Sequence, residues 1–197
     1  MKTLIIYAHP NTPGHCPHIL KEIEEHLQEE DADYELLDLY KMKYDPILHE
    51  DEHYTTGERE ISDQNKDIQK SIQDSDRMIF IYPVWWNSMP AILKGFFDKV
   101  LTPHFAFKFT PFKVLGQSLP KKLLSGKKAA LFMTTGSQWW IFHFILHQRA
   151  VSIAAKDTLG FCGIKAKAFP VYGATQLTDK HMITIKKTVK KGLKWLY

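Results

Sequence analysis

Short, almost wholly apolar runs alternate with helical patterns along this chain of 197 residues, and this alternation limits its fold more than any other feature. We expect strands at Thr3–Ala8, Tyr34–Leu39, Met78–Tyr82, Lys128–Thr134 and Lys165–Val171. Strands that are apolar on both sides suit a parallel sheet with both faces covered. We therefore predict one α/β domain over residues 1–197, with helices on both faces of a five-stranded parallel sheet.

Apolar residues at helical spacing lie between and after these runs. They predict helices at Pro17–Gln28, Ile61–Ser75, Ser88–Leu101, from the fourth strand to about Ala155, and at Leu177–Leu196. Ser88 is a suitable cap for the third helix, and Pro90 fits its first turn. The apolar stripe of that helix, which includes Phe97, should face the sheet as core.

Composition excludes several classes of protein. Two cysteines in unrelated contexts, Cys16 and Cys162, imply neither a disulfide framework nor zinc spacing, and a reducing cytoplasm is the simplest setting. The first residues, MKTLIIYAHP, lack the organisation of a signal peptide. The longest apolar stretch, Trp139–Ala155, is interrupted by histidine, glutamine and arginine, so we expect no membrane insertion.

The net charge of +4 comes largely from lysines in the last predicted helix. They alternate with apolar residues at helical spacing, which is typical of a solvated helix face. No nucleic-acid-binding motif accompanies them, so we expect no nucleic-acid partner.

In parallel sheets of this kind, ligands bind beyond the carboxyl ends of the strands, near the point where the strand order reverses. Three loops are therefore of interest: HPNTPGHCP, PVWWNSMP and TTGSQWW. The first has no acidic residue between His9 and His18 and leads into a helix, whose N-terminus suits a phosphate. The alternatives are a loop that only turns the chain, and a metal site. His9, His15, Cys16 and His18 match no familiar ligand spacing, so we expect no metal.

The second loop places Trp85 and Trp86 just past the third strand, where a flat heteroaromatic ring could lie against them. The alternative is that both rings seal a hydrophobic edge. The third loop offers Thr134, Thr135, Gly136 and Ser137, hydroxyls and a close backbone that could bind the edge of a ring system. Together the three loops suggest a phosphorylated flat cofactor.

The run WWIFHFILH follows the third loop. His143 and His147 are four apart, which would put them on one helix face. The zinc-protease motif needs a glutamate where Phe144 stands, so that reading is excluded. The run either lines a pocket or packs against a second subunit, and the competing view is an internal helix that covers the sheet.

The chain resembles the NAD(P)H:quinone oxidoreductase family of flavodoxin-like flavoproteins, which includes bacterial potassium-efflux ancillary reductases and modulators of drug activity. The matching pieces are LIIYAHPN, LLDLYKMKYDPIL, PVWWNSMPAILKGFFDKVL, HFAFKF, GKKAALFMTTG and LGFCGI. The resemblance implies a three-layer sandwich with strand order 2-1-3-4-5. It also implies FAD or FMN, reduced by NADH or NADPH and reoxidised by a quinone-like acceptor in ping-pong fashion, and a homodimer whose interface completes the active site.

Carried over by position, His9 and the segment Gly14, His15 and Cys16 would hold the flavin phosphate or ribose. The isoalloxazine would be lined by Pro83, Val84, Trp85, Trp86 and Asn87, and its polar edge bound by Thr134, Thr135, Gly136 and Ser137. Relatives have a tyrosine–histidine pair farther on, where this chain has Phe142, His143 and His147; we take the two histidines as catalytic candidates. Backbone N–H groups, Thr135 or His147 would stabilise charge on the reduced ring.

Two other functions fit the same resemblance. One is an azo- or nitro-reductase that uses the same flavin on another acceptor, and the other is a regulatory flavoprotein subunit of a potassium-efflux system. A one-electron carrier like flavodoxin is disfavoured, because flavodoxins usually have a strongly acidic surface and this chain is net positive.

Overall fold

The computed structural model describes residues 1–10, 13–53, 60–114 and 117–197. Its main sheet is parallel, with the order β2-β1-β3-β6-β7. These strands are β1 Thr3–Tyr7, β2 Tyr34–Asp38, β3 Arg77–Pro83, β6 Lys128–Thr134 and β7 Lys165–Val171. In chain order this is the expected 2-1-3-4-5 arrangement, and all five predicted strands are confirmed within a residue at each end.

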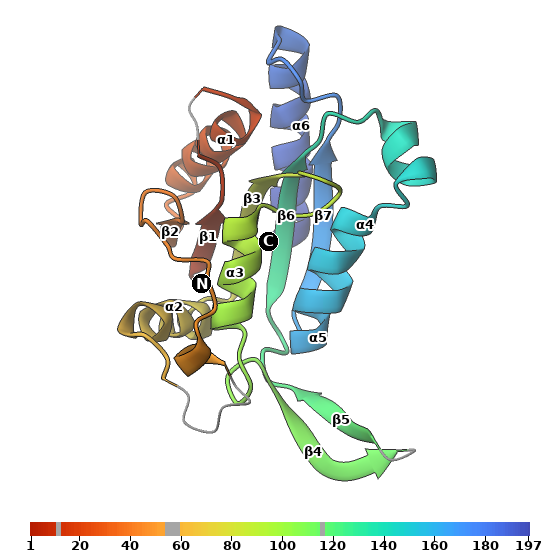
Figure 1. Ribbon diagram of the computed structural model, residues 1–197. Coiled ribbons are helices and arrows are strands. Elements are labelled where there is room, and N and C mark those ends of the chain that lie inside the picture. Colours follow the sequence, from red (N-terminus) through yellow and green to blue (C-terminus); the bar gives the residue numbers. More distant parts are fainter. Residues whose placement is uncertain (11–12, 54–59, 115–116) are drawn as a thin grey trace.

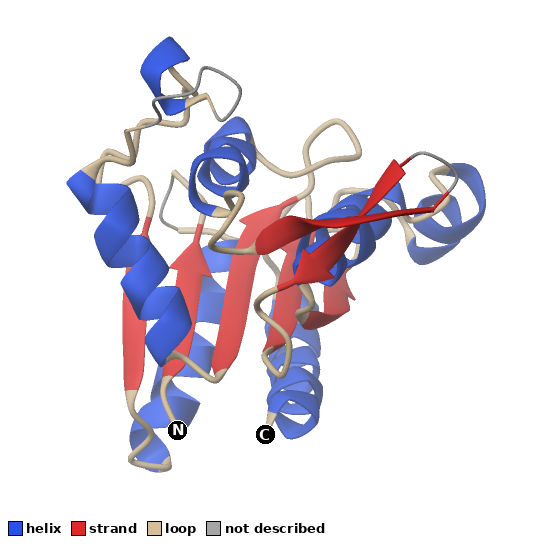
Figure 2. Cartoon of the chain, turned by 90° about the horizontal axis from the view of Figure 1, so that it is seen from below, coloured by secondary structure: helices blue, strands red, loops and turns tan. Residues whose placement is uncertain are grey.

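Helices cover both faces of this sheet (Figures 1 and 2). α1 His15–Glu29 and α6 Asp179–Leu196 pack on one face, through Ile19, Ile23, Ile185 and Leu193. α2 Asp63–Asp74, α3 Ala91–Val100 and the segment from η3 Ser152–Leu159 to α5 Gly160–Cys162 cover the other face. The predicted three-layer sandwich is therefore confirmed.

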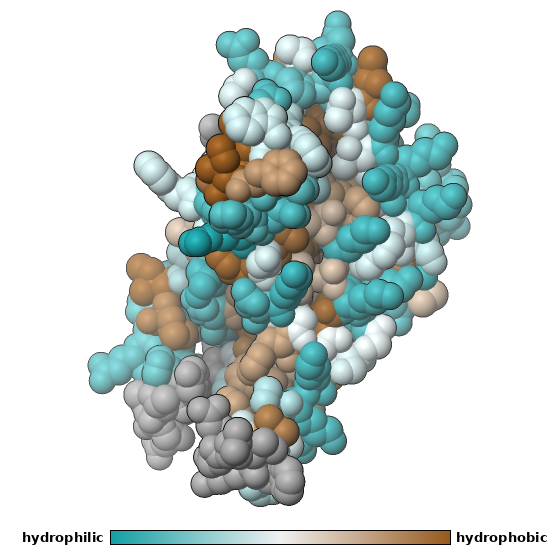
Figure 3. Space-filling model, turned by 90° about the vertical axis from the view of Figure 1, so that its right-hand side faces the viewer, coloured by the Kyte–Doolittle hydropathy of each residue, from teal (hydrophilic) through white to brown (hydrophobic). Residues whose placement is uncertain are grey.

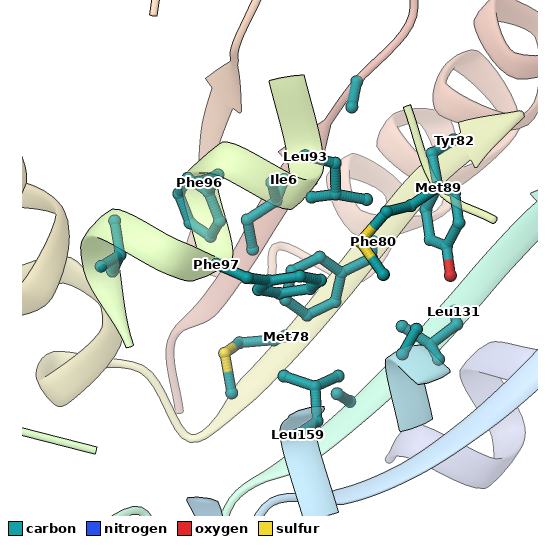
Figure 4. Packing of buried hydrophobic residues seen from close by; sticks show 14 of the residues in the cluster. Ile6, Met78, Phe80, Tyr82, Met89, Leu93, Phe96, Phe97, Leu131 and Leu159 are labelled. Atoms are coloured by element: carbon teal, nitrogen blue, oxygen red, sulfur yellow. The ribbon is translucent and has the colours of Figure 1, made fainter. Parts of the chain in front are cut away.

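Alternating apolar positions on the strands fill the two interfaces. On the α3 side, Phe80 and Phe97 pack with their ring centroids 5.4 Å apart, beside Leu93 and Leu131 (Figure 4). The predicted α3 stripe is therefore core.

The start of α3 differs from the prediction. Ser88 does not cap the helix, because both its backbone groups bond to Trp85 in a closed turn. Pro90 occupies the N-cap position instead, with its carbonyl accepting from Leu93 and Lys94. The helix begins at Ala91, three residues later than expected.

The stretch after β6 is not one helix, as was predicted. It contains a wide π-type turn, η2 Ile141–Ile145, then a break in which His147 and Gln148 have positive φ angles of 50° and 51°. A short helix, α4 Arg149–Val151, continues into η3. The placement of His143 and His147 on one helix face was therefore wrong.

An antiparallel hairpin between α3 and β6 has no counterpart in the predicted elements. β4 Phe107–Val114 pairs with β5 Gln117–Lys122 and extends away from the main sheet (Figure 1). Elsewhere a short 3₁₀ turn, η1 Glu50–Glu52, interrupts the loop after β2. Within the described ranges, no helix is both long and apolar enough to cross a bilayer.

Candidate functional site

The three loops of interest meet at the carboxyl edge of the sheet. Strand register places Tyr7 beside Ile81, and Pro83 beside Thr134. Backbone hydrogen bonds between neighbouring strands continue one residue past the paired positions. The Ala8 N–H donates to the Ile81 carbonyl at 2.9 Å, and the Val84 N–H donates to the Thr134 carbonyl at 2.7 Å. The structure therefore confirms that the three loops lie at the same edge of the sheet.

The first loop ends in an uncapped helix N-terminus. Gly14 stands at the N-cap of α1, no side chain caps the helix, and no acidic residue lies in its first turn. His18 N–H is the first to bond back, to Gly14 at 3.1 Å. The preceding N–H groups of His15 and Cys16 have no intrahelical acceptor, and Pro17 has no N–H to add. This is the local arrangement that favours an anion.

Only the backbone of Cys16 can serve such an anion. Its side chain is buried in the core between α1 and the sheet, with Sγ 3.4 Å from the hydroxyl of Thr134. Burial raises the thiol pKa to about 12, so the sulfur stays protonated. The hydroxyl of Thr134 is likewise committed to Cys16, which leaves the rest of the third loop to meet a ligand.

His15 joins the N-termini of α1 and α6. Its ring packs edge to face on His181, with centroids 4.8 Å apart, and its Nε2 is buried without a hydrogen-bond partner. Burial, with the nearby His181 and His18, lowers the His15 pKa. The ring is therefore held neutral at physiological pH.

The second loop is a tight two-residue turn that presents a tryptophan. Trp85 and Ser88 exchange backbone hydrogen bonds of 3.0 and 2.9 Å, and the residues between them, Trp86 and Asn87, have left-handed φ angles of 50° and 57°. Both values fit a type I′ turn. The Trp86 side chain is fully exposed, at 101%, so it does not seal the core. Backbone strain at a residue this large is typical of a functional position.

Asn87 connects the second loop to the segment after the third. Its Nδ2 donates to the Leu146 carbonyl at 3.2 Å, and its Oδ1 is buried without a partner. The amide thus holds the chain at the break before α4.

The third loop is tied to the end of β7. Thr135 N–H donates to Val171 at 3.0 Å, and Thr135 Oγ1 accepts from Ser137 N–H at 3.2 Å. Gly173 N–H in turn donates to the Ser137 carbonyl at 3.0 Å. Gly136 between them is exposed, so a backbone edge is open to a ligand.

The two histidine candidates have different surroundings. His143 Nδ1 lies 2.9 Å from the Trp139 carbonyl, and because a carbonyl only accepts, Nδ1 donates this hydrogen bond. Its ring also packs on Trp139, with centroids 4.8 Å apart. His147 is exposed at the break, next to the Leu146 carbonyl that Asn87 holds.

Tyr172 lies beside a candidate site residue and was not among the residues predicted from the sequence. It follows β7 directly, and its ring centroid lies 5.8 Å from that of His143. Burial raises the Tyr172 pKa, so the phenol remains a proton donor. Its position just past the fifth strand, at the same edge as the three loops, was the available signal.

An apolar patch borders the site. Trp139, Trp140, Phe144 and Ile145 are 52%, 54%, 67% and 57% exposed, whereas Phe142 alone of this run is fully buried. Hydrophobic side chains gather on the upper part of the face that carries this segment (Figure 3). The run is thus not an internal helix over the sheet. In the described ranges, no group of three or more histidine, cysteine or acidic side chains could hold a metal ion.

A doubly wound parallel sheet with an open helix N-terminus, an exposed aromatic turn and a glycine loop at one edge defines a flavodoxin-like protein. The family model for the flavodoxin-like fold matches residues 1–193. An NAD(P)H oxidoreductase of Haemophilus influenzae is 31% identical over 181 residues, which cover 91% of this chain and 87% of that protein. The ribosyldihydronicotinamide dehydrogenase [quinone] of Pongo abelii is 32% identical over 205 residues, 91% of this chain and 84% of the relative.

Solved structures have the same fold. Smu.1420 from Streptococcus mutans superposes with a TM-score of 0.84 at 26% identity, over 98% of this chain and all of that one. An FMN-dependent NADH-azoreductase from Bacillus anthracis, solved with FMN, superposes with a TM-score of 0.77 at 18% identity, over 100% and 99% of the two chains, and shows likeness of fold alone. This chain belongs to the flavodoxin-like NAD(P)H:quinone oxidoreductase family.

Proposed function

We propose that this protein binds a flavin at the three loops and reduces quinone-like acceptors with NADH or NADPH. The observation that carries the proposal is the convergence of an uncapped helix N-terminus, the exposed Trp86 and the open Gly136 at one sheet edge. The dehydrogenase of Pongo abelii is named for a quinone acceptor, which supports this choice.

The chain's groups fit a phosphorylated flavin. The N–H groups of His15 and Cys16 and the side chain of His9 would hold the phosphate, and the backbone from Pro83 to Asn87 would border the ring. Buried polar atoms usually have a hydrogen-bond partner. The Oδ1 of Asn87 and the Nε2 of His15 are buried without one at this edge of the sheet, so a bound ligand could supply it.

When bound, the flavin supplies the hydride-carrying chemistry, taking two electrons from a nicotinamide and passing them to the acceptor. The third loop would meet the polar edge of the ring through Thr135, Gly136 and Ser137. Reduction of a quinone also needs protons. The His143 ring packs against the ring of Tyr172, whose phenol keeps its proton, and His147 is exposed to solvent. These side chains would hold and move the protons.

We also propose a homodimer, with the patch of Trp139, Trp140, Phe144 and Ile145 at its interface. A contiguous apolar patch on a protein surface marks an association site, and tryptophan and phenylalanine are enriched in interfaces. The patch adjoins His143, so a second copy bound there would cover the part of the candidate site where the quinone-like acceptor would bind.

An azoreductase is the second candidate, because the Bacillus anthracis protein with this fold is an FMN-dependent NADH-azoreductase. A regulatory role on a potassium-efflux system rests on resemblance alone.

The test is reconstitution. Purified protein would be titrated with FAD and with FMN, and then assayed with NADH or NADPH against a quinone and an azo dye. We expect one flavin to bind well below 100 µM, the concentration that corresponds to only ~5.5 kcal/mol, and quinone turnover to exceed azo turnover. Binding of neither flavin below that concentration would refute the proposal.

A further inference from the structure

Two strained turns adjoin at the candidate site. In the turn after β3, Trp86 and Asn87 have φ angles of 50° and 57°, and in the break before α4, His147 and Gln148 have φ angles of 50° and 51°. Left-handed backbone costs free energy at any residue other than glycine, so each turn persists only because contacts around it hold it. Strain of this kind is concentrated at functional positions.

Asn87 joins the two turns. Its Nδ2 donates to the Leu146 carbonyl at 3.2 Å, and within the described ranges this is the only hydrogen bond between residues 84–90 and 139–149. Asn87 is itself held in place, because its turn is closed by the two backbone hydrogen bonds between Trp85 and Ser88. The amide therefore restrains the break from a fixed position.

The bond acts on the residue that follows Leu146, which is His147. The Leu146 carbonyl and the Cα of His147 belong to one peptide plane, so a restraint on the carbonyl oxygen also restrains the point from which the His147 side chain starts. The same oxygen accepts from the Arg149 N–H at 3.2 Å, but that bond lies within the segment itself. Asn87 is therefore the group that places the break relative to the aromatic turn.

A histidine at this position has a task in the proposed reaction. A quinone becomes a quinol by taking up a hydride and one proton. In the proposed function the hydride comes from the nicotinamide by way of the flavin, and a side chain must supply the proton. Histidine is the side chain that most often transfers protons near neutral pH. His147 is exposed, so water can return the proton after each turnover.

A small displacement of such a group has a large effect. Proton transfer needs the donor within hydrogen-bond reach of the acceptor, and a shift of about 1 Å is enough to slow a reaction. The left-handed backbone at His147 and Gln148 favours a shift, because the strain is relieved when the segment relaxes. Loss of the Asn87 bond removes the restraint that opposes this relaxation.

We propose that Asn87 is a positioning residue for proton transfer: through the Leu146 carbonyl it holds His147 beside the aromatic turn, where His147 gives its proton to the quinone-like acceptor. Asn87 itself need not touch the acceptor. The inference rests on the proposed function, because it needs a bound flavin and quinone turnover.

The first test is a double-mutant cycle on quinone turnover at saturating flavin. Asn87→Asp keeps the size of the side chain and loses the donor, and Asn87→Gly removes the side chain and keeps the left-handed turn. Either should lower kcat about 3- to 10-fold, with the KM for the nicotinamide unchanged. His147→Gln should lower kcat at least about tenfold. Because Asn87 acts through His147, Asn87→Gly should lower kcat no further when His147→Gln is already present.

Gln69→Ala is the matched control. The Gln69 amide also donates to a backbone carbonyl of another element, that of Val100 at 2.9 Å, but at the C-terminal end of α3. This variant should leave kcat unchanged.

A second readout needs no flavin. In the apoprotein, Asn87→Gly should shift the NMR ring signals of His147, which the spectrum of His147→Gln identifies by their absence. The signals of His26, in the last turn of α1, should stay unchanged.

The outcomes separate the two claims. If no flavin binds or no quinone is reduced, the proposed function fails and this inference fails with it. If quinone is reduced but His147→Gln is fully active, or the two losses multiply in the double variant, or the His147 signals do not move, the proposed function stands and the role of Asn87 is overturned. Asn87→Asp can replace Asn87→Gly in the cycle, so the test stands even if one of them does not fold.

Discussion

The side-chain amide of Asn87 donates a hydrogen bond of 3.2 Å to the backbone carbonyl of Leu146, although 59 residues separate them. This bond connects the aromatic turn after β3 to the break before α4, so it links two sides of the candidate site. Asn87 also has a left-handed φ of 57°, which glycine adopts without strain. Asn87→Gly therefore removes the hydrogen bond and keeps the turn.

We expect Asn87→Gly to cost about 0.5–1.5 kcal/mol of unfolding free energy and to loosen the segment around Leu146. Hydrogen exchange should show faster exchange at residues 146–149 than in the wild type, with β3 and β6 unchanged. Equal exchange at that segment would show that the amide does not restrain it.

Trp86→Gly should separate stability from function. The left-handed backbone at Trp86 is strained, and the side chain contributes nothing to the core, so glycine should raise the unfolding free energy by about 0.5–1 kcal/mol. Flavin affinity or turnover should fall, because the exposed ring is lost. Phe97→Ala is the contrast: this core ring should cost roughly 3–5 kcal/mol. Denaturant titration and flavin titration of both variants measure the two effects, and an exchange of the two phenotypes would contradict the assignment.

Two buried tyrosines should respond differently to loss of the hydroxyl. The Tyr82 hydroxyl is buried without a partner and points towards Leu131 among carbon atoms (Figure 4), whereas the Tyr44 hydroxyl donates to Asn65 at 2.9 Å. Tyr82→Phe should leave stability unchanged or raise it by up to about 1 kcal/mol, and Tyr44→Phe should cost about 1–3 kcal/mol. Urea unfolding measures both. A large loss in Tyr82→Phe would indicate a bound water at that hydroxyl.

Stability of the apoprotein should depend on pH through His15. Burial lowers the pKa of His15 in the folded protein. As pH falls through about 6.5, His15 therefore takes up a proton in the unfolded chain while it stays neutral in the folded protein. Stability should therefore fall on acidification through that range and be recovered as pH rises. His15→Phe removes this contribution. Unfolding free energies measured from pH 5 to 8 should show a smaller pH dependence in the variant, and identical slopes would mean that His15 titrates normally.

The apolar patch should control assembly. We expect the wild type to sediment as a dimer at micromolar concentration, because Trp140 and Phe144 expose apolar rings that a partner would cover. The double variant Trp140→Glu, Phe144→Glu should be a folded monomer that keeps its flavin and loses quinone reduction. A wild type that is monomeric and fully active would end this proposal.

Local sequence was sufficient to predict the main sheet and to predict that the three loops of the candidate site lie at one edge of it. The three central strands, β1, β3 and β6, are short and almost wholly apolar and buried, and such strands are typical of a parallel sheet that is covered on both faces. Once the strands are parallel, their carboxyl ends share one edge, so the loops at His9, Trp86 and Gly136 had to come together.

Tertiary structure decided what depends on contacts between distant residues. The stretch after β6 is apolar throughout, so its periodicity could not show the π-type turn or the left-handed break at His147. Ser88 is a residue type that commonly caps helices, but in the structure its backbone N–H and carbonyl both bond to Trp85 and close a turn before the helix begins. The ring of Tyr172 packs against that of His143, which lies on a distant segment. Tyr7 and Asp38 line one cavity although they come from different strands. No local pattern encodes such pairs, because packing of the whole sheet sets the distance between their side chains.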